Sequence, residues 1–321
     1  MADGGKMRLV DDVRTVREQF PEVVLTIGSF DGVHLGHQAI LRDVAERARR
    51  RGGTACVMTM QPHPREYFSP DRPPNLLTSE AQKARLLEEF GMHVLFVLPF
   101  DATVARMTAE AFIDEIILRR CQAVEVVIGH DFRFGKDARG DYEFLAERLG
   151  HHGASAVQVA PVHVAGERIS STLIRECLLE GDLERAAQLL GRRYTLAGQV
   201  VSGRGIGAEL GYPTANIKPD HSAVPAHGVY AALAQVSGET RPAAINIGIA
   251  PTISHEDLTI EAHILGFSGH ITGELIELEF FERLRPERRF PSKKALIAQI
   301  AQDVQTVQAF FDTLKTFTNC R

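Results

Sequence analysis

Two histidines three residues apart, His34 and His37, lie in the stretch Gly28-Ser-Phe-Asp-Gly-Val-His-Leu-Gly-His. Side chains with this spacing on a helix face the same way, so both imidazoles can donate to one group of oxygens. A helix N-terminus adds free N–H groups and a partial positive charge, and Gly36 has no side chain to block an anion. The pattern predicts a site where phosphate oxygens gain charge during transfer, although a lone histidine would more often be structural.

Three further polar clusters follow segments that have the composition of strands. They contain His63 between two prolines, Asp131 and Phe132 in Gly-His-Asp-Phe-Arg-Phe-Gly, and Ser170-Ser-Thr172 with Arg175 one helical turn later. The carboxyl ends of parallel strands meet at one sheet edge, so we expect one composite site. Hydroxyls at a helix start and a fork-shaped guanidinium suit phosphate. The plainer alternatives are a turn at His63, core packing of Phe132 and an ordinary capped helix.

A second set of polar residues occurs late in the sequence. Thr214 and Asn216, in Gly-Tyr-Pro-Thr-Ala-Asn, offer a hydroxyl and an amide oxygen two residues apart. Such hard oxygen ligands suit a magnesium ion that keeps several waters and binds nucleotide phosphates. In isolation the same residues would form only a turn.

Two different element patterns must position these sets. From Val23 to about Ala160, β-branched runs alternate with helical patterns, which predicts an α/β domain with a doubly wound parallel sheet. After Asp182, five strand-like segments with glycine-rich connections predict a small antiparallel barrel, and Ser292 caps an amphipathic helix over 293–311. We expect one domain over 8–184 and a second over 185–318.

Composition excludes several classes of protein. The 321 residues carry 36 Lys plus Arg against 41 Asp plus Glu, which gives no basic footprint for nucleic acid or an anionic membrane. The four cysteines are far apart without a CxxC pair, which argues against a zinc site and a disulfide framework. The longest strongly apolar stretch, 94–100, is too short to span a bilayer, and the N-terminus lacks a signal core. We expect an unprocessed cytoplasmic protein.

The combination GSFDGVHLGHQ, PHP, GHDFRFG and ISSTLIR resembles the adenylyltransferase half of bacterial bifunctional riboflavin kinase/FAD synthetases. The resemblance implies Mg-dependent attack of the FMN phosphate on the α-phosphorus of ATP, with pyrophosphate leaving. It implies catalytic roles for His34, His37 and Arg175. It also implies that ATP contacts Gly28, Phe30, Gly36, Ser170, Ser171 and Thr172, and that the flavin contacts His63, Asp131 and Phe132.

The later segments, GYPTAN, NIGIAPT, Glu261 and 285–290, resemble the riboflavin kinase module of the same family. The resemblance implies ATP-dependent phosphorylation of riboflavin, with Glu261 taking the proton that the 5′-hydroxyl must lose. It assigns Mg to Thr214 and Asn216, ATP to Gly205 and Gly207, and the flavin to Arg285.

Some residues depart from the family pattern. Met60-Gln61 stands where an aromatic and an acidic residue are usual, Ala208 stands where arginine is common, and 269–273 is also altered. Two alternatives therefore stay open: a single-activity adenylyltransferase with a degenerate flavin-binding or regulatory barrel, and a non-enzymatic flavin sensor. The HxGH and ISSTxIR motifs argue against a sensor, because flavin binding alone does not need groups for ATP phosphates.

Overall fold

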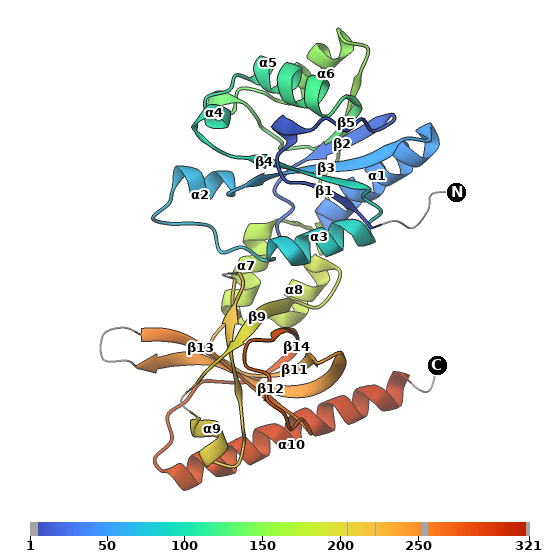
Figure 1. The fold of residues 1–321 in the computed structure, drawn as a ribbon. Coiled ribbons are helices and arrows are strands. Elements are labelled where there is room, and N and C mark those ends of the chain that lie inside the picture. Colours follow the sequence, from blue (N-terminus) through green and yellow to red (C-terminus); the bar gives the residue numbers. More distant parts are fainter. Residues whose placement is uncertain (1–5, 204, 222, 252–255, 319–321) are drawn as a thin grey trace. The chain divides into compact units, whose positions relative to one another are not determined.

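The structure, a computed structural model, describes residues 6–203, 205–221, 223–251 and 256–318 (Figure 1). Contacts divide the chain into two compact units, one of Met1–Pro74 with Glu80–Ser171 and one of Asn75–Ser79 with Thr172–Arg321. The segment Asn75–Ser79 belongs with the second unit, where the carbonyl of Leu76 accepts from the N–H of Ala223 at 3.0 Å. The first unit contains a parallel sheet and the second a closed antiparallel barrel, so the predicted fold class is confirmed.

The sheet of the first unit has six parallel strands in the order β1-β4-β3-β2-β5-β6. Their bounds are β1 (Arg8–Val10), β2 (Val23–Ile27), β3 (Thr54–Gln61), β4 (Val94–Pro99), β5 (Ala123–Gly129) and β6 (Ser155–Val159). The central strands β2 to β5 are almost wholly buried, as expected for a sheet with both faces covered. Sequence analysis did not anticipate β1, because three residues carry too little pattern.

Helices cover both faces of this sheet. One face packs on α1 (Leu35–Arg51) and α3 (Glu80–Glu89). The other packs on the π-helix η2 (Phe112–Arg120) and on α6 (Tyr142–Gly150). The short elements are η1 (Val13–Thr15), α2 (Pro64–Phe68), α4 (Ala102–Ala105), α5 (Ala109–Ala111), η3 (Lys136–Ala138), β7 (His163–Val164) and β8 (Glu167–Arg168).

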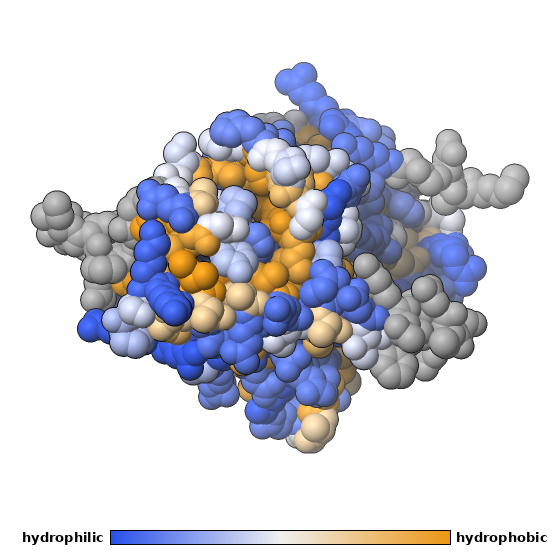
Figure 2. All heavy atoms as spheres, turned by 90° about the horizontal axis from the view of Figure 1, so that it is seen from below, coloured by the Kyte–Doolittle hydropathy of each residue, from blue (hydrophilic) through white to orange (hydrophobic). Residues whose placement is uncertain are grey.

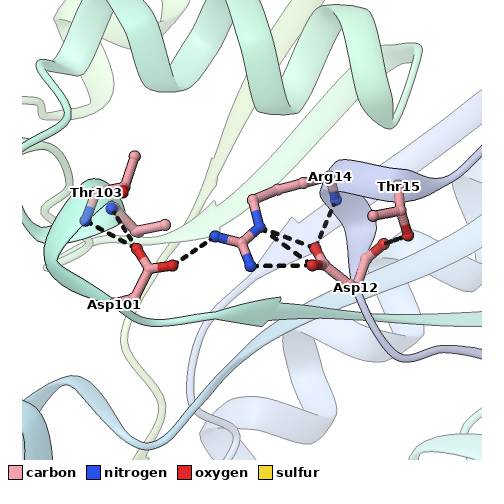
Figure 3. A network of polar contacts seen from close by, with 6 residues as sticks. Asp12, Arg14, Thr15, Asp101 and Thr103 are labelled. Carbon is pink, nitrogen blue, oxygen red and sulfur yellow. Dashed lines mark hydrogen bonds and ion pairs between the residues drawn. The ribbon is translucent and has the colours of Figure 1, made fainter.

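An ion-pair network fastens the start of the chain to the carboxyl edge of the sheet (Figure 3). Arg14 of η1 donates to Asp12 at 2.9 Å and to Asp101, just after β4, at 2.6 Å. Asp101 also accepts from the backbone N–H groups of Thr103 and Val104, as the N-cap of α4. The network therefore holds β1 beside β4 at the edge where the strands end.

The barrel of the second unit closes in the order β10-β13-β12-β11-β14-β9. Its strands are β9 (Thr195–Val201), β10 (Ala215–Pro219), β11 (Gly228–Val236), β12 (Glu239–Pro251), β13 (Glu256–Ile264) and β14 (Leu275–Pro286). Strand β10 was not expected, because its first residues belong to a motif that otherwise forms turns. Strand β14 also runs farther than expected, so that Arg285 lies on a strand and not in a charged loop.

Helix α10 (Lys293–Thr318) packs across the outside of the barrel, where Val307 and Phe311 contact Ala231 of β11. It is longer than the predicted 293–311. Helices α7 (Ser171–Glu180) and α8 (Leu183–Leu190) group with the barrel, together with the short α9 (Ile206–Glu209). The division between compact units therefore falls at Ser171, ahead of the residue 184 at which we expect the first functional domain to end.

At one end of the barrel, the residues that continue the inward-facing rows of β12 and β13 are exposed to solvent. Ile249 and Leu258, directly paired across β12 and β13, continue the buried rows of Ile247 and Ile260 but are themselves exposed. Apolar residues also gather in the middle of the face drawn in Figure 2, with hydrophilic residues around them. Among the described residues, no helix is long and apolar enough to cross a membrane.

Candidate active sites

His34 is the N-cap of α1, and its ring stacks on that of His37. The ring centroids are 3.7 Å apart and the planes differ by 12°. The Nδ1 atom of His34 accepts a hydrogen bond from the backbone N–H of His37 at 3.3 Å, which leaves the proton of the neutral ring on Nε2. The N–H groups of the first helical turn, Gly36 among them, lie at the same end of the helix and favour an anion there. The structure thus brings both predicted histidines and Gly36 together.

Burial lowers the pKa of His37 well below its ordinary value, and the neighbouring His34 and Lys83 lower it further. The Nδ1 atom of His37 is sealed from solvent and has no hydrogen-bond partner within the described part of the chain. His37 is therefore neutral at neutral pH. It offers hydrogen bonding, not a fixed positive charge.

The loop that leads into α1 is strained. Phe30 and Val33 have positive φ angles of 48° and 41°, a region that bulky side chains rarely adopt. Both are buried, so packing holds the conformation, and such strain clusters at functional sites. The Phe30 ring lies 5.0 Å from that of His37, and a Cβ at Gly28 would come within 3.2 Å of it. These two predicted ATP contacts shape the loop that presents the histidines.

The serine-rich motif adjoins the same loop. The Oγ of Ser171 donates to the backbone carbonyl of Asp31 at 3.0 Å, which links the start of α7 to the stretch carrying His34. Thr172 and Arg175 belong to the second compact unit. There the Nε of Arg175 donates to the carbonyl of Asn75 at 2.5 Å.

The three residues predicted to contact flavin in the first unit follow β3 and β5. His63 is the N-cap of α2, and its Nδ1 accepts from a backbone N–H two residues later at 3.1 Å. The carboxylate of Asp131 is already ion-paired with Arg168 of β8. Phe132 stacks on Phe134 with centroids 5.5 Å apart and packs against the core. Phe132 therefore has a structural role whatever else it contacts.

One cross-strand row on the outer face of the barrel contains Asn216, Glu261 and Arg285, three of the residues predicted for the second site. Asn216 of β10 lies directly opposite Glu261 of β13, and Glu261 lies directly opposite Asn246 of β12. The row continues through Val229 of β11 to Arg285 of β14. Directly opposite residues of antiparallel strands project from the same face, so an amide, a carboxylate and a second amide lie side by side.

Two glycines bring the glycine-rich loop against the predicted metal ligands. A Cβ at Gly203 would lie 1.9 Å from the Nδ2 of Asn216, and a Cβ at Gly207 would lie 2.8 Å from the Oγ1 of Thr214. Only glycine permits so close an approach. Gly205, between them, has a φ of +73° in open space. The loop backbone therefore forms a cradle over Thr214 and Asn216.

Two contacts hold the outer parts of this site in place. The Nδ1 of His263, two residues beyond Glu261 on β13, donates to the carbonyl of Pro213 at 2.8 Å and so fixes the residue before Thr214. On β14, Arg285 pairs with Asp303 of α10 at 2.7 Å, with side chains only 17% and 9% exposed. The predicted flavin contact at Arg285 is thus also the link between the barrel and α10.

Sequence analysis assigned no role to Asn246, Gly203 or Asp303. Asn246 begins the NIGIAPT segment, but its place beside Glu261 follows only from strand register, because it is an outward residue between two buried isoleucines on β12. Gly203 requires knowledge of how the loop folds back on Asn216. Asp303 is an acidic residue on the buried side of α10. The helical period of the sequence places it on that side, and a buried carboxylate predicts a buried cationic partner.

The residues around Thr214 fit a magnesium ion. A hydroxyl and an amide oxygen under a glycine cradle, with the carboxylate of Glu261 beside Asn216, form a hard oxygen set that leaves positions for water and phosphate. No group of three or more His, Cys, Asp or Glu side chains in the described residues could hold a metal ion. Thr214 and Asn216 would supply two ligands, and water and nucleotide phosphates would complete the coordination of the ion.

Family models match both halves of the chain. The model described as FAD synthetase matches residues 16–173, and the model described as riboflavin kinase matches residues 190–311. A solved structure described as a macrolide-efflux protein from Streptococcus pneumoniae has a TM-score of 0.84 at 29% identity, covering 94% of this chain and 99% of that one.

Curated relatives match this chain over nearly their whole length. The bifunctional riboflavin kinase/FMN adenylyltransferase of Pseudomonas fluorescens is 36% identical over 304 residues, which cover 94% of this chain and 97% of the relative. The protein of the same description from Escherichia coli K12 is 35% identical over 311 residues, covering 96% and 99%. The chain belongs to the family of bifunctional riboflavin kinase/FMN adenylyltransferases.

Proposed function

We propose that the chain makes FAD from riboflavin in two ATP-dependent steps, phosphorylation to FMN by residues 185–318 and adenylylation of FMN by residues 8–184. The proposal rests on two separate groups of residues, each suited to binding phosphate. One is the stacked pair of His34 and His37 at a helix start, and the other is the Asn216–Glu261 pair under a glycine cradle. A flavin sensor would need neither.

In adenylyl transfer, an oxygen of the FMN phosphate attacks the α-phosphorus of ATP, and the bond to pyrophosphate breaks. The nucleophile is already an anion, so the site has to position it and offset charge, and it needs no base. His34 donates from Nε2 to a phosphate oxygen, and His37, kept neutral, supports the stacked ring. Arg175, whose Nε donates to the carbonyl of Asn75 in this structure, is the proposed source of the guanidinium.

In phosphorylation, the 5′-hydroxyl of riboflavin attacks the γ-phosphorus of ATP, and ADP leaves. Glu261 accepts the hydroxyl proton, which is the usual task of a carboxylate beside an alcohol nucleophile. The backbone of Gly205 and Gly207 lies over the phosphates, and Arg285, held by Asp303, borders the flavin. A magnesium ion held by Thr214 and Asn216 would neutralise charge on the phosphates when bound.

The proposed substrates are riboflavin, FMN and ATP, and the proposed compartment is the cytoplasm. Support for a reducing compartment comes from Cys56, Cys121 and Cys177, which are free and buried. The remaining flavin contacts, His63, Asp131 and Phe132, follow the strands of the adenylyl-transfer unit.

Incubating the purified full chain with riboflavin, ATP and magnesium and separating the flavins by chromatography tests the proposal. FMN followed by FAD is the expected result. FAD formed only from added FMN would identify the barrel as a degenerate module, and binding of flavin without any product would identify a sensor.

A further inference from the structure

Lys83 is a buried cation that neither proposed reaction step uses. It is the fourth residue of α3, its side chain is 5% exposed, and its Nζ lies 2.8 Å from the Oε1 of Glu80. Glu80 itself is 43% exposed. Pairs at this spacing are common on helix surfaces, where they leave both groups in water. Here the lysine is buried, so the chain carries a desolvation cost that an exposed pair avoids.

Helix position makes the charge less favourable still. The first turn of a helix has a partial positive charge, so a lysine there opposes the macrodipole that an acidic residue would complement. The buried side of α3 is otherwise lined by Gln82, Leu86 and Leu87. An anion on the buried side of α3 would offset this cost more fully than Glu80, which is 43% exposed.

Helix α3, which carries Lys83, packs in the same core cluster as the loop that leads into α1. Leu86 and Leu87 of α3 pack in the same cluster as Phe30 and Val33 of the loop that presents the histidines. In a crossover helix that precedes β4, the first turn lies at the carboxyl edge of the sheet, where that loop also lies. The positive charge of Lys83 also contributes, after burial and His34, to the lowered pKa of His37.

Two buried polar atoms near this edge lack partners. The Nδ1 of His37 and the Oγ1 of Thr59 have no hydrogen-bond partner anywhere in the described ranges. Thr59 alternates with Ala55 and Val57, so it is on the face of β3 that α1 and α3 cover. It is one residue beyond Met58, whose carbonyl accepts from the N–H of Gly28. Unsatisfied buried groups of this kind suit a polar ligand.

We propose that Lys83 is a further phosphate-binding group of the adenylyl-transfer site, released from Glu80 when the phosphates of ATP or pyrophosphate enter beside His34 and His37. The inference rests on the proposed function of this site. The flexible four-carbon stem of lysine allows the ammonium to exchange one anion for another while the stem stays buried. Glu80 then acts as a stand-in for the phosphate.

The reverse reaction tests the proposal without involving the barrel, because FAD and pyrophosphate give FMN and ATP at the adenylyl-transfer site alone. Lys83→Met should raise the KM for pyrophosphate by about 10- to 100-fold, the value of one charge-assisted hydrogen bond. Lys83→Arg should retain most of the affinity. Arg119→Met removes an exposed helix pair with Glu115 in the same unit and should change nothing.

The variant Glu80→Gln distinguishes two roles of Lys83, namely binding of phosphate and formation of an ion pair that only stabilises the helix. If Lys83 binds phosphate, the variant frees the ammonium and lowers the KM for pyrophosphate. If the pair only stabilises α3, Lys83→Met and Glu80→Gln lower thermal stability together and leave the KM unchanged, which overturns the proposal. Should Lys83→Met fail to fold, Glu80→Gln still decides, because an unchanged or higher KM contradicts it. A wild-type chain that forms no FAD would instead refute the proposed function.

Discussion

Asn216 and Glu261 lie directly opposite each other on β10 and β13, so an amide and a carboxylate project side by side from the outer face of the barrel. The pairing places the proposed general base next to a proposed magnesium ligand. A substitution that displaces the side chain of Asn216 should therefore slow phosphorylation even when the protein remains folded.

Gly203→Ala is expected to reduce riboflavin phosphorylation by about 100-fold, the cost of misplacing reacting groups by roughly an ångström. The added Cβ would lie 1.9 Å from the Nδ2 of Asn216, so the amide has to shift. Initial rates of FMN formation check this, with FAD formation from FMN as the internal reference. Gly150→Ala, where a Cβ meets nothing within 4 Å, is the matched control. If Gly203→Ala forms FMN at the wild-type rate, Asn216 does not take part in phosphorylation.

Asp303→Ala is expected to lower the stability of the second unit by about 3 kcal/mol, because it leaves the largely buried guanidinium of Arg285 without its partner. Phosphorylation should show a raised KM for riboflavin, since Arg285 loses its orientation. Urea unfolding and steady-state rates measure the two effects. In the double variant Arg285→Leu with Asp303→Leu, stability should partly recover while the KM stays high. Recovery of both would mean that Arg285 does not contact flavin.

How much the sequence predicts depends on whether the signal is local. The histidine pair, the helix that it caps and the alternation of strands and helices follow from neighbouring residues, and they were predicted. The row that joins Asn216 to Asn246 was not, because register is a property of paired strands. For the same reason β10 was missed, since its residues pair with β9 and β13 and show little pattern of their own.

Acid should weaken the first unit through the network of Figure 3. The Arg14 guanidinium, with backbone N–H groups of α4, lowers the pKa of Asp101 from 3.8 to about 2. Because the folded-state pKa is the lower one, the stabilisation is present above the unfolded value and is lost as pH falls toward about 2. Asp101→Asn should flatten the pH dependence of the urea midpoint in that range. An unchanged slope would mean that the network does not contribute.

Ala208 stands on α9, where its side chain is exposed and an arginine has room. Ala208→Arg should lower the KM for ATP in phosphorylation by about 10- to 100-fold, the value of one charge-assisted hydrogen bond. Arg204, which lies outside the described residues, is the competing candidate for the phosphate contact. If Arg204 already binds the phosphate, Ala208→Arg should change the KM for ATP little and Arg204→Ala should raise it strongly. No effect from either change would exclude this loop from ATP binding.

Two separate sites, one for each reaction, are the central claim, and product chromatography of two single variants tests it most directly. His34→Ala should abolish most FAD formation from FMN and leave riboflavin phosphorylation nearly unchanged. Glu261→Gln should lower phosphorylation by about 10²- to 10⁴-fold, the usual loss for a general base, and leave adenylyl transfer intact. His151→Ala and Glu239→Gln, both exposed residues away from the two sites, serve as controls. Equal loss of both activities in a well-folded His34→Ala protein would contradict the two-site account.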